Sequence, residues 1–235
     1  MANSLENIDV VILTGGKGER LISVVNDRPK TMVEVNRSPL LVTLTDYLSI
    51  QGFKRFILCT GYRGDYIKKY FEKHPTESEI IISHEEQPLG TGGGVKHAEE
   101  FIQSDPFFVL NGDSLCELDY AGMNKYHEEK ASNVTIVVTK VRSKSDFGSI
   151  VIDHDYRVLS FIEKKESANT NYVNAGIYCF RREMLQLMPS SIPFSIEKEY
   201  FPSIINRSVF AYVTSQPFFD IGTPERLQLF TQKNK

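Results

Sequence analysis

The chain lacks tryptophan and contains only three cysteines among its 235 residues. Cys59, Cys116 and Cys179 are odd in number and far apart, which excludes a disulfide framework and a CxxC metal site. Each lies in or beside an apolar run, so we expect all three to be small buried hydrophobic residues. Free thiols of this kind are typical of a protein in a reducing compartment.

The chain also lacks long apolar runs and an excess of positive charge. Its apolar runs are a few residues long, against the roughly 20 residues that a membrane-spanning helix needs. The polar N-terminus MANSLENID does not resemble a signal peptide. The net charge of -3 argues against nucleic-acid binding. We therefore expect a cytoplasmic protein with no membrane or nucleic-acid partner, whose anion sites depend on local residues.

The first half of the sequence alternates between strand and helix patterns. Apolar runs predict strands at 10–13, 55–59, 80–82 and 107–110, and helical periodicity predicts helices near 39–48, 65–70 (capped by Asp65) and 95–102. This alternation predicts an α/β fold with a Rossmann-like, doubly wound, mainly parallel sheet. Ligands of such sheets bind at the carboxyl ends of the strands, where a glycine loop at 15–18 and the turn 111–113 fall.

The second half is richer in strands. We expect strands at 134–141, 172–180, 209–213 and 218–219, a hairpin formed by 149–152 and 158–161, and a short helix at 184–188. A surface helix near 120–130, surface positions for all five histidines and a helix start at Thr223-Pro224-Glu225 complete the prediction. We interpret 1–235 as a single domain with halves of about 8–120 and 121–235 and a small strand-rich sub-lobe near 140–205.

The strongest motif is the glycine-rich segment that follows the first strand. Glycines at this point allow backbone N–H groups to approach phosphates, and Arg20 and Lys30 add positive charge. A Walker A loop is excluded because GxxxxGK[ST] is absent, and a dinucleotide fingerprint is excluded because Leu21 stands where its last glycine should be. From these residues alone, a flexible turn with two surface cations is an equal alternative.

The segment LTGGKGERL, with RPKTM ten residues on, resembles the L-A-G-G-x-G-T-R-L and P-K-P-M signature of the sugar nucleotidyltransferases. It departs from that signature at Thr14, Glu19 and Thr31, and the role of the acidic Glu19 in a phosphate loop stays open. The resemblance implies that Arg20 and Lys30 are catalytic. It also implies a nucleotide-binding loop formed by Leu13, Gly15, Gly16 and Gly18.

A second motif is the segment EEQPLGTGGG at 85–94. Consecutive glycines weaken a helix by roughly 1 kcal/mol each, so we expect the close approach of something flat, such as a base or a ribose. The alternative is an ordinary loop before a glycine-rich helix start. The segment is similar to the family's E-x-x-P-L-G-T-[AG]-G, which implies that Glu85, Gly90 and Thr91 belong to the nucleoside pocket.

Two aspartates occupy positions of further family motifs. Taken alone, Asn111-Gly112-Asp113 is a turn signal, and Asp220 suits a turn or a helix cap. They resemble the family's L-x-G-D and D-[IV]-G-T-P segments, which implies that Asp113 and Asp220 bind Mg²⁺. One or two carboxylates plus substrate phosphates form a typical site for this cation.

The last matching segments are Phe161-Ile162-Glu163-Lys164 and Asn174-Ala175-Gly176. Glu163 and Lys164 also suit solvated charges at a strand end, and a glycine within a strand marks a bulge or a close approach. The match to the family's F-x-E-K and N-A-G segments implies that Lys164 holds the sugar phosphate. It also implies that Gly112, Glu163 and Asn174 contribute to the site for the sugar phosphate.

The resemblance extends from Val10 to about Gln228 and is most similar to the D-glycero-D-manno-heptose 1-phosphate guanylyltransferases. It implies transfer of a nucleoside monophosphate from an NTP, GTP in the first place, to this sugar 1-phosphate with release of pyrophosphate, and it predicts no C-terminal β-helix. Mannose-1-phosphate guanylyltransferase and uridylyl-, cytidylyl- or thymidylyltransferases stay open. Other classes that stay open are a non-catalytic nucleotide-sugar sensor and a glycosyltransferase, and so does a homodimer.

Overall fold

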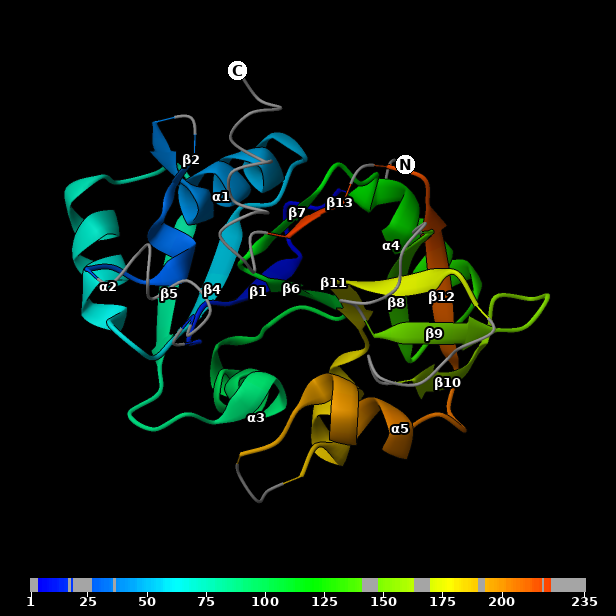
Figure 1. Cartoon of the computed structure of the whole chain (residues 1–235). Coiled ribbons are helices and arrows are strands. Elements are labelled where there is room, and N and C mark those ends of the chain that lie inside the picture. The colour runs from blue at the N-terminus through cyan, green and yellow to red at the C-terminus, as the bar shows by residue number, and fades with distance from the viewer. Residues whose placement is uncertain are drawn as a thin grey trace.

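The computed structural model describes residues 4–16, 18, 27–35, 37–140, 148–162, 170–189, 193–216 and 218–220 (Figure 1). Within these ranges no helix has the length and apolar character that crossing a membrane requires. A nine-stranded sheet runs through the molecule, with strand order β10-β9-β11-β6-β1-β4-β5, and β8 joins β11 to β12. Its strands are β1 (Asp9–Leu13), β4 (Arg55–Thr60), β5 (Glu79–His84), β6 (Phe107–Asn111), β8 (Val134–Lys140), β9 (Ser149–Ile152), β10 (Val158–Ile162), β11 (Tyr172–Phe180) and β12 (Val209–Thr214).

The four strands of the first half are parallel, as predicted. β1 pairs with β4 on one side and with β6 on the other, and β4 pairs in turn with β5. Parallel strands place their carboxyl ends at one edge of the sheet, so the segments after these four strands meet there. Backbone hydrogen bonds extend the pairing past the strand ends, from Thr14 N to Cys59 O at 2.9 Å and from Gly112 N to Leu13 O at 2.9 Å.

The strands of the second half continue the same sheet. β11 pairs antiparallel with β6, and β8 lies antiparallel beside β11. β9 and β10 form the predicted hairpin. The strand-rich region near 140–205 therefore contributes strands to the central sheet, joined to the first half through β11 and β6.

Two short ribbons lie outside the main sheet. β2 (Glu34–Val35) pairs with β3 (Ser38–Pro39), and β7 (Ser114–Cys116) pairs antiparallel with β13 (Phe218–Asp220). The second ribbon matters for the site because β7 begins directly after Asp113. The expected helix start at Thr223-Pro224-Glu225 lies outside the described residues.

Helices cover both faces of the sheet (Figure 1). They are α1 (Leu40–Ile50), α2 (Gly64–Lys73), α3 (Gly90–His97), α4 (Tyr120–Glu129) and α5 (Phe201–Ser203), with 3₁₀ turns at Lys30–Met32, Glu99–Phe101 and Arg182–Leu187 and a π-helix at Ile196–Tyr200. One apolar core contains Val10, Ile12 and residues of α1, α2 and α4. The other contains Val11 and residues of α3, α5 and the π-helix. Alternate residues of a strand thus enter opposite cores, as a strand covered on both faces requires.

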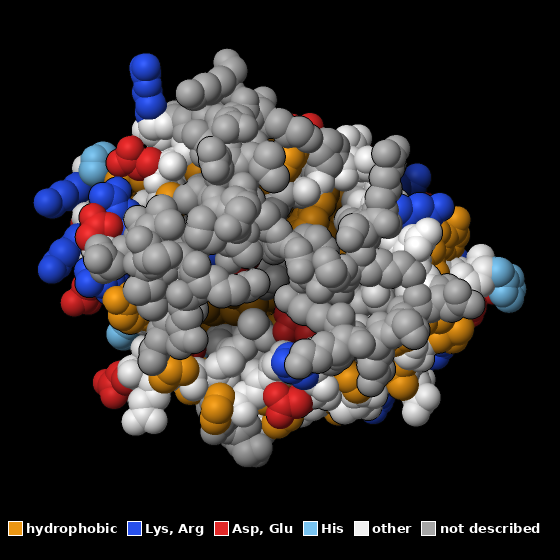
Figure 2. Space-filling model, in the orientation of Figure 1, with side chains coloured by type: hydrophobic (Ala, Val, Ile, Leu, Met, Phe, Trp, Pro, Cys, Tyr) orange, Lys and Arg blue, Asp and Glu red, His pale blue; other side chains and the backbone are white. Residues whose placement is uncertain are grey.

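Helix α2 is amphipathic, with an apolar face toward the core and a charged face toward solvent. Ile67 and Phe71 are buried, while Lys and Arg side chains gather with acids on its outer side (Figure 2). The predicted cap at Asp65 is wrong: the residue before the helix is Arg63, in a left-handed conformation with φ of 55°, and Asp65 lies inside the first turn. There its carboxylate is favourably placed near the positive end of the helix.

All three cysteines are buried, as expected from their apolar surroundings. The expectation that every histidine lies at the surface is wrong for His127, which is fully buried on α4. Its Nδ1 lies 2.8 Å from Thr135 Oγ1, and its Nε2 has no partner among the described residues. Burial lowers the pKa of His127 from 6.5 to about 3, because the charged imidazolium would lose its hydration.

The buried imidazole of His127 predicts a loss of stability in mild acid. Below pH 6.5 the imidazole is protonated in the unfolded chain, whereas in the folded chain it stays neutral down to about pH 3. Stability from this residue is therefore complete above pH 6.5 and falls as the pH drops toward 3. Between pH 7.5 and 5 we expect a loss of roughly 2 kcal/mol in the free energy of unfolding, measured by urea denaturation.

In His127→Gln that pH-dependent loss should shrink, whatever the stability of the variant at pH 7.5. His154→Gln is the matched control, because the His154 side chain is 88% exposed and should leave the slope unchanged. An undiminished slope in His127→Gln would show that other groups cause the acid sensitivity.

Candidate active site

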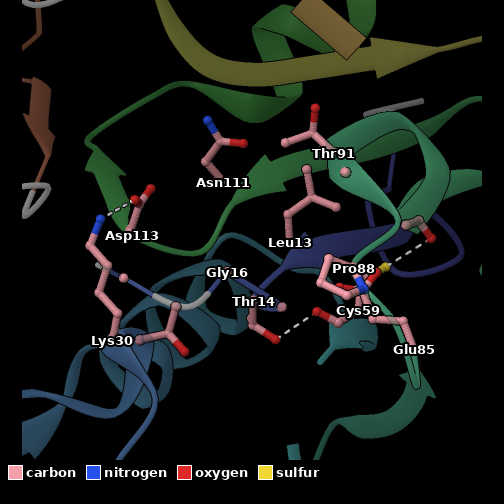
Figure 3. A pocket seen from close by; sticks show the side chains of 15 residues that line it. Leu13, Thr14, Gly16, Lys30, Cys59, Glu85, Pro88, Thr91, Asn111 and Asp113 are labelled. Atoms are coloured by element: carbon pink, nitrogen blue, oxygen red, sulfur yellow. Dashed lines mark hydrogen bonds and ion pairs between the residues drawn. The ribbon is translucent and has the colours of Figure 1, made fainter. Parts of the chain in front are cut away.

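A cavity of about 710 Å³ opens at the carboxyl edge of the parallel strands. The carboxyl end of β4, the segments after β1, β5 and β6 and the first turns of α3 line it (Figure 3). Nine of the residues predicted from motifs line this one cavity: Leu13, Gly15, Gly16, Gly18, Lys30, Glu85, Gly90, Thr91 and Asp113. Thr14, Thr31, Cys59, Pro88, Gly94 and Asn111 also line it, and the motifs gave no functional prediction for them.

The glycine loop forms the floor of the cavity between its two ends (Figure 3). Thr14 is held in place by two bonds to Cys59 O, from its backbone N at 2.9 Å and from its Oγ1 at 2.8 Å. A Cβ added to Gly16 would meet nothing within 4 Å among the described atoms, so this backbone faces open space. Exposed loop N–H groups above a sheet edge are suited to phosphate oxygens.

One end of the cavity is formed by Glu85, directly after β5 (Figure 3). Its Oε2 accepts a hydrogen bond from Leu89 N at 3.3 Å. A Cβ on Gly15 or on Gly61 would lie 2.7 Å from Glu85 Oε1, so both glycines make room for the carboxylate. Burial raises the pKa of Glu85 above its ordinary value of 4.5. A half-buried carboxylate of this kind can accept hydrogen bonds from a ligand's N–H groups.

The other end contains an ion pair between Lys30 Nζ and Asp113 Oδ2 (Figure 3). Lys30 begins the 3₁₀ turn Lys30–Met32, and a Cβ on Gly18 would lie 3.0 Å from Lys30 Cβ, so the glycine loop packs closely against it. Asp113 follows β6, and its Oδ1 accepts from Ser114 Oγ at 3.3 Å. The pair places a cation and a carboxylate together beside the glycine loop.

The two predicted metal ligands lie at the β7–β13 ribbon, with Asp113 directly before β7 and Asp220 at the end of β13. The β7–β13 register pairs Asp220 with Ser114, the residue after Asp113, so the backbone brings the two aspartate positions close together. The Asp220 side chain lies outside the described residues. Among the described residues, no three His, Cys, Asp or Glu side chains form a cluster that could hold a metal ion. Any metal here would depend on the aspartates and on oxygen atoms of the substrate.

The glycines of α3 face two different neighbours, the Phe194 ring and the cavity. A Cβ on Gly92 would overlap the ring of Phe194, and Phe194 O accepts from Gly92 N at 3.0 Å. The flat group expected beside these glycines is therefore, at Gly92, a phenylalanine of the protein itself. Gly90 and Gly94 line the cavity, and Gly90 adopts a φ of +74°, which favours glycine.

Thr91 and Asn174 belong to one hydrogen-bonded chain. Thr91 Oγ1 donates to Glu197 Oε2 at 2.8 Å, and Tyr178 OH donates to Glu197 Oε1 at 3.1 Å. Asn174 Nδ2 in turn donates to Tyr178 OH at 2.8 Å. The motifs gave no role to Glu197 or Tyr178. The only signal in the sequence is an acid at 197 and a tyrosine two residues after Gly176, and neither indicates a partner.

The other predicted residues take different positions. Gly112 and Asn174 do not line the cavity; a Cβ on Gly112 would lie 2.9 Å from Leu13 O, so this glycine allows β1 and β6 to pack closely beyond their ends. Arg20, Glu163 and Lys164 lie outside the described residues, as does Glu19.

Comparison with known proteins decides the family. The family model described as nucleotidyl transferase matches residues 9–233, nearly the whole chain. The chain belongs to the nucleotidyl transferase family. The resemblance inferred from the motifs is thereby confirmed, and so is the fold class.

This nucleotidyl transferase is similar to HddC from Yersinia pseudotuberculosis, crystallised in complex with GMP-PN: identity is 38%, TM-score 0.86, and 97% of this chain and 100% of that chain are covered. It is 32% identical to the mannose-1-phosphate guanylyltransferase of Mycobacterium tuberculosis over 93% of this chain and 62% of that protein. The chain thus spans about three fifths of the length of such curated relatives. A putative glucose-1-phosphate thymidylyltransferase from Bacillus anthracis, 19% identical with a TM-score of 0.84, covers 96% of this chain and 94% of its own and shares the fold.

The contact between Gly92 and Phe194 predicts that Gly92→Ala destabilises the protein. An alanine inside a helix normally gains about 0.5–1 kcal/mol over glycine, but here the new methyl group overlaps the Phe194 ring. We expect a net loss of about 1–3 kcal/mol in chemical denaturation.

Gly94→Ala in the same helix is the control for the contact at Gly92. Its Cβ would have nearest neighbours at 3.5 Å, an ordinary contact, so stability should stay level or rise. Equal effects of the two substitutions would contradict the role given to Phe194.

Proposed function

We propose that this nucleotidyl transferase transfers GMP from GTP to a sugar 1-phosphate and releases pyrophosphate. The observation that carries the proposal is one cavity with a glycine loop on its floor, a half-buried carboxylate at one end and the Lys30–Asp113 pair at the other (Figure 3). A nucleoside triphosphate matches this layout, with its base toward Glu85 and its phosphates along the loop toward Lys30.

The carboxylate of Glu85 supports guanine as the base. Guanine presents two neighbouring donors, its ring N–H and its exocyclic amino group, which a carboxylate can accept as a pair. Uracil and thymine present one ring N–H flanked by carbonyl oxygens, which would face the negative charge. The complex of the similar HddC protein with GMP-PN is consistent with this preference.

The reaction needs alignment and charge neutralisation more than proton transfer. A sugar phosphate is already an anionic nucleophile, so attack on the α-phosphorus requires no general base. The obstacle is repulsion between two anions, which preorganised donors can offset. Lys30 would face the charge developing at the α-phosphate, and the N–H groups of Gly15 and Gly16 would hold the departing pyrophosphate with Arg20.

The donor set at the Lys30 end also fits Mg²⁺. Asp113 and Asp220 would hold the cation, since carboxylate oxygens are the ligands that it prefers, with the remaining positions left to substrate oxygens and water. When bound, Mg²⁺ would draw negative charge from the phosphates. Lys30, which pairs with Asp113 here, would be released to the substrate phosphates.

For the sugar we propose D-glycero-D-manno-heptose 1-phosphate first, on the resemblance of the 85–94 segment, and mannose 1-phosphate second. Names among the relatives, such as the mannose-1-phosphate guanylyltransferase of Mycobacterium tuberculosis, support the second. The test is pyrophosphate release with Mg²⁺, a panel of sugar 1-phosphates and GTP, ATP, UTP, CTP or dTTP. One strongly preferred pair with GTP supports the proposal. Release with another base corrects the nucleotide, and nucleotide binding without release favours a sensor.

The ion pair at the cavity end predicts that Lys30→Met lowers kcat by about 100-fold or more, as loss of one preorganised charge donor typically does. Asp113→Asn should lower turnover as strongly, because the variant loses the negative charge that holds Mg²⁺. Steady-state pyrophosphate release measures both effects, and circular dichroism checks the fold. Normal turnover in either variant would remove that residue from the mechanism.

The position of Glu85 predicts that Glu85→Gln lowers kcat/KM for GTP and narrows its advantage over UTP. The amide keeps one acceptor but adds donors that oppose the guanine N–H groups, for an expected loss of about tenfold or more. Glu86→Gln changes the same charge one residue away and serves as the control. An unchanged GTP-to-UTP ratio in Glu85→Gln would show that the base is selected elsewhere.

A further inference from the structure

The partly buried carboxylate of Glu197 connects residues of the two predicted substrate sites. Glu197 accepts from Thr91, which lines the cavity, and from Tyr178, which contacts Asn174. It also accepts from Ser195 Oγ at 2.9 Å. Thr91 and Asn174 were predicted to bind different substrates, so the carboxylate spans both halves of the reaction.

The charge of Glu197 sets the direction of every hydrogen bond in this chain. An ionised carboxylate only accepts, so the Tyr178 hydroxyl must donate its proton to Glu197. The Tyr178 oxygen is then an acceptor, and Asn174 must turn its Nδ2 toward it. Asn174 Oδ1 faces the other way and accepts from Gly176 N at 2.9 Å. Glu197, acting through Tyr178, and Gly176 N together fix which face of the Asn174 amide a sugar would meet.

At the other end, Glu197 fixes the side chain of Thr91. The single proton of Thr91 Oγ1 goes to Glu197, and one lone pair accepts from Ile196 N at 2.9 Å. The hydroxyl therefore cannot donate to a nucleotide. Its role at the cavity is to hold the first turn of α3 in place, with Gly90 beside it.

The backbone around Glu197 supports a role beyond packing. Glu197 lies on the π-helix Ile196–Tyr200, and such helices are rare and frequently occur at functional sites. Ser195 caps this helix by accepting from Lys198 N at 3.2 Å. Phe194, two residues before the π-helix, packs on Gly92, so the segment 194–197 contacts α3 both through Phe194 and through Glu197.

We propose that Glu197 is a positioning residue that couples the nucleotide site to the sugar site. It holds Thr91 on one side and, through Tyr178, orients Asn174 on the other. The inference rests on the proposed function, because it assigns the two ends of the chain to the two substrates. The chain has two arms, the hydrogen bond from Thr91 to Glu197 and the hydrogen bonds from Asn174 through Tyr178 to Glu197. A substitution in one arm leaves the hydrogen bonds of the other arm in place.

The experiment compares Glu197→Gln with one variant for each arm. Thr91→Val removes the arm to the nucleotide site, and Tyr178→Phe removes the arm to Asn174 while keeping the buried ring. With GTP and mannose 1-phosphate, Thr91→Val should raise KM for GTP alone and Tyr178→Phe should raise KM for the sugar phosphate alone. Glu197→Gln should raise both, each by about five- to tenfold.

Combining Tyr178→Phe with Glu197→Gln tests the connection directly. If both act through one chain, the double variant has the sugar-phosphate KM of Glu197→Gln alone. Glu199→Gln is the matched control: the same charge is lost from the same π-helix, and both KM values should stay at the wild-type level. Multiplied effects in the double variant, or wild-type KM values in Glu197→Gln, would overturn the coupling.

Calorimetric titration with GTP alone separates this inference from the proposed function. A wild-type protein that releases no pyrophosphate with any pair contradicts the proposed function only. In that case Glu197→Gln and Thr91→Val should still weaken GTP binding to the same degree, with Tyr178→Phe unchanged. GTP affinity that is equal in wild type and Glu197→Gln would overturn the role of Glu197 as well.

Discussion

Parallel pairing of β1 with both β4 and β6 is the constraint on which the site depends. It places three strand ends side by side, and the hydrogen bonds from Thr14 N to Cys59 O and from Gly112 N to Leu13 O continue the alignment into the loops. Because those loops start from a fixed edge, the glycine loop, Glu85 and Asp113 open onto one cavity although they are up to 100 residues apart in sequence. A β1 that paired on one side only would leave either Glu85 or Asp113 without a fixed position relative to the loop.

The glycines at this edge of the sheet have different neighbours: some allow close packing of the protein, and others border the cavity. The space beside Gly92 is filled by the Phe194 ring, and the space beside Gly112 is filled by the Leu13 carbonyl oxygen. Gly15 makes room for Glu85, and Gly16 faces open space. A glycine in a family motif is thus not by itself evidence of a bound ligand. What separates the two groups is the nature of the neighbour, which only the folded chain reveals.

The sequence was sufficient for the fold because its signals are local. Continuous apolar runs such as 10–13 predict buried parallel strands, and turn residues directly after them mark the ligand edge. The residues around Glu197 could not be predicted in this way. Thr91 and Glu197 are separated by more than 100 residues, and neither periodicity nor spacing indicates which acid a threonine will meet. His127 escaped prediction for a similar reason, since a histidine among polar residues on a helix indicates a surface position until β8 supplies Thr135.

Three carboxylates lie close to a cavity that suits anionic substrates, and each has different hydrogen-bonding or ion-pair partners. Asp113 is paired with the ammonium group of Lys30. Glu85 is half-buried, which raises its pKa, and it lies at the end of the cavity that we assign to an uncharged base instead of a phosphate. Glu197 accepts hydrogen bonds from the hydroxyl groups of Thr91, Ser195 and Tyr178, which disperse its charge. Under the proposed function, these carboxylates would orient and select the substrates, while the glycine loop and Lys30 would offset the charge of the phosphates.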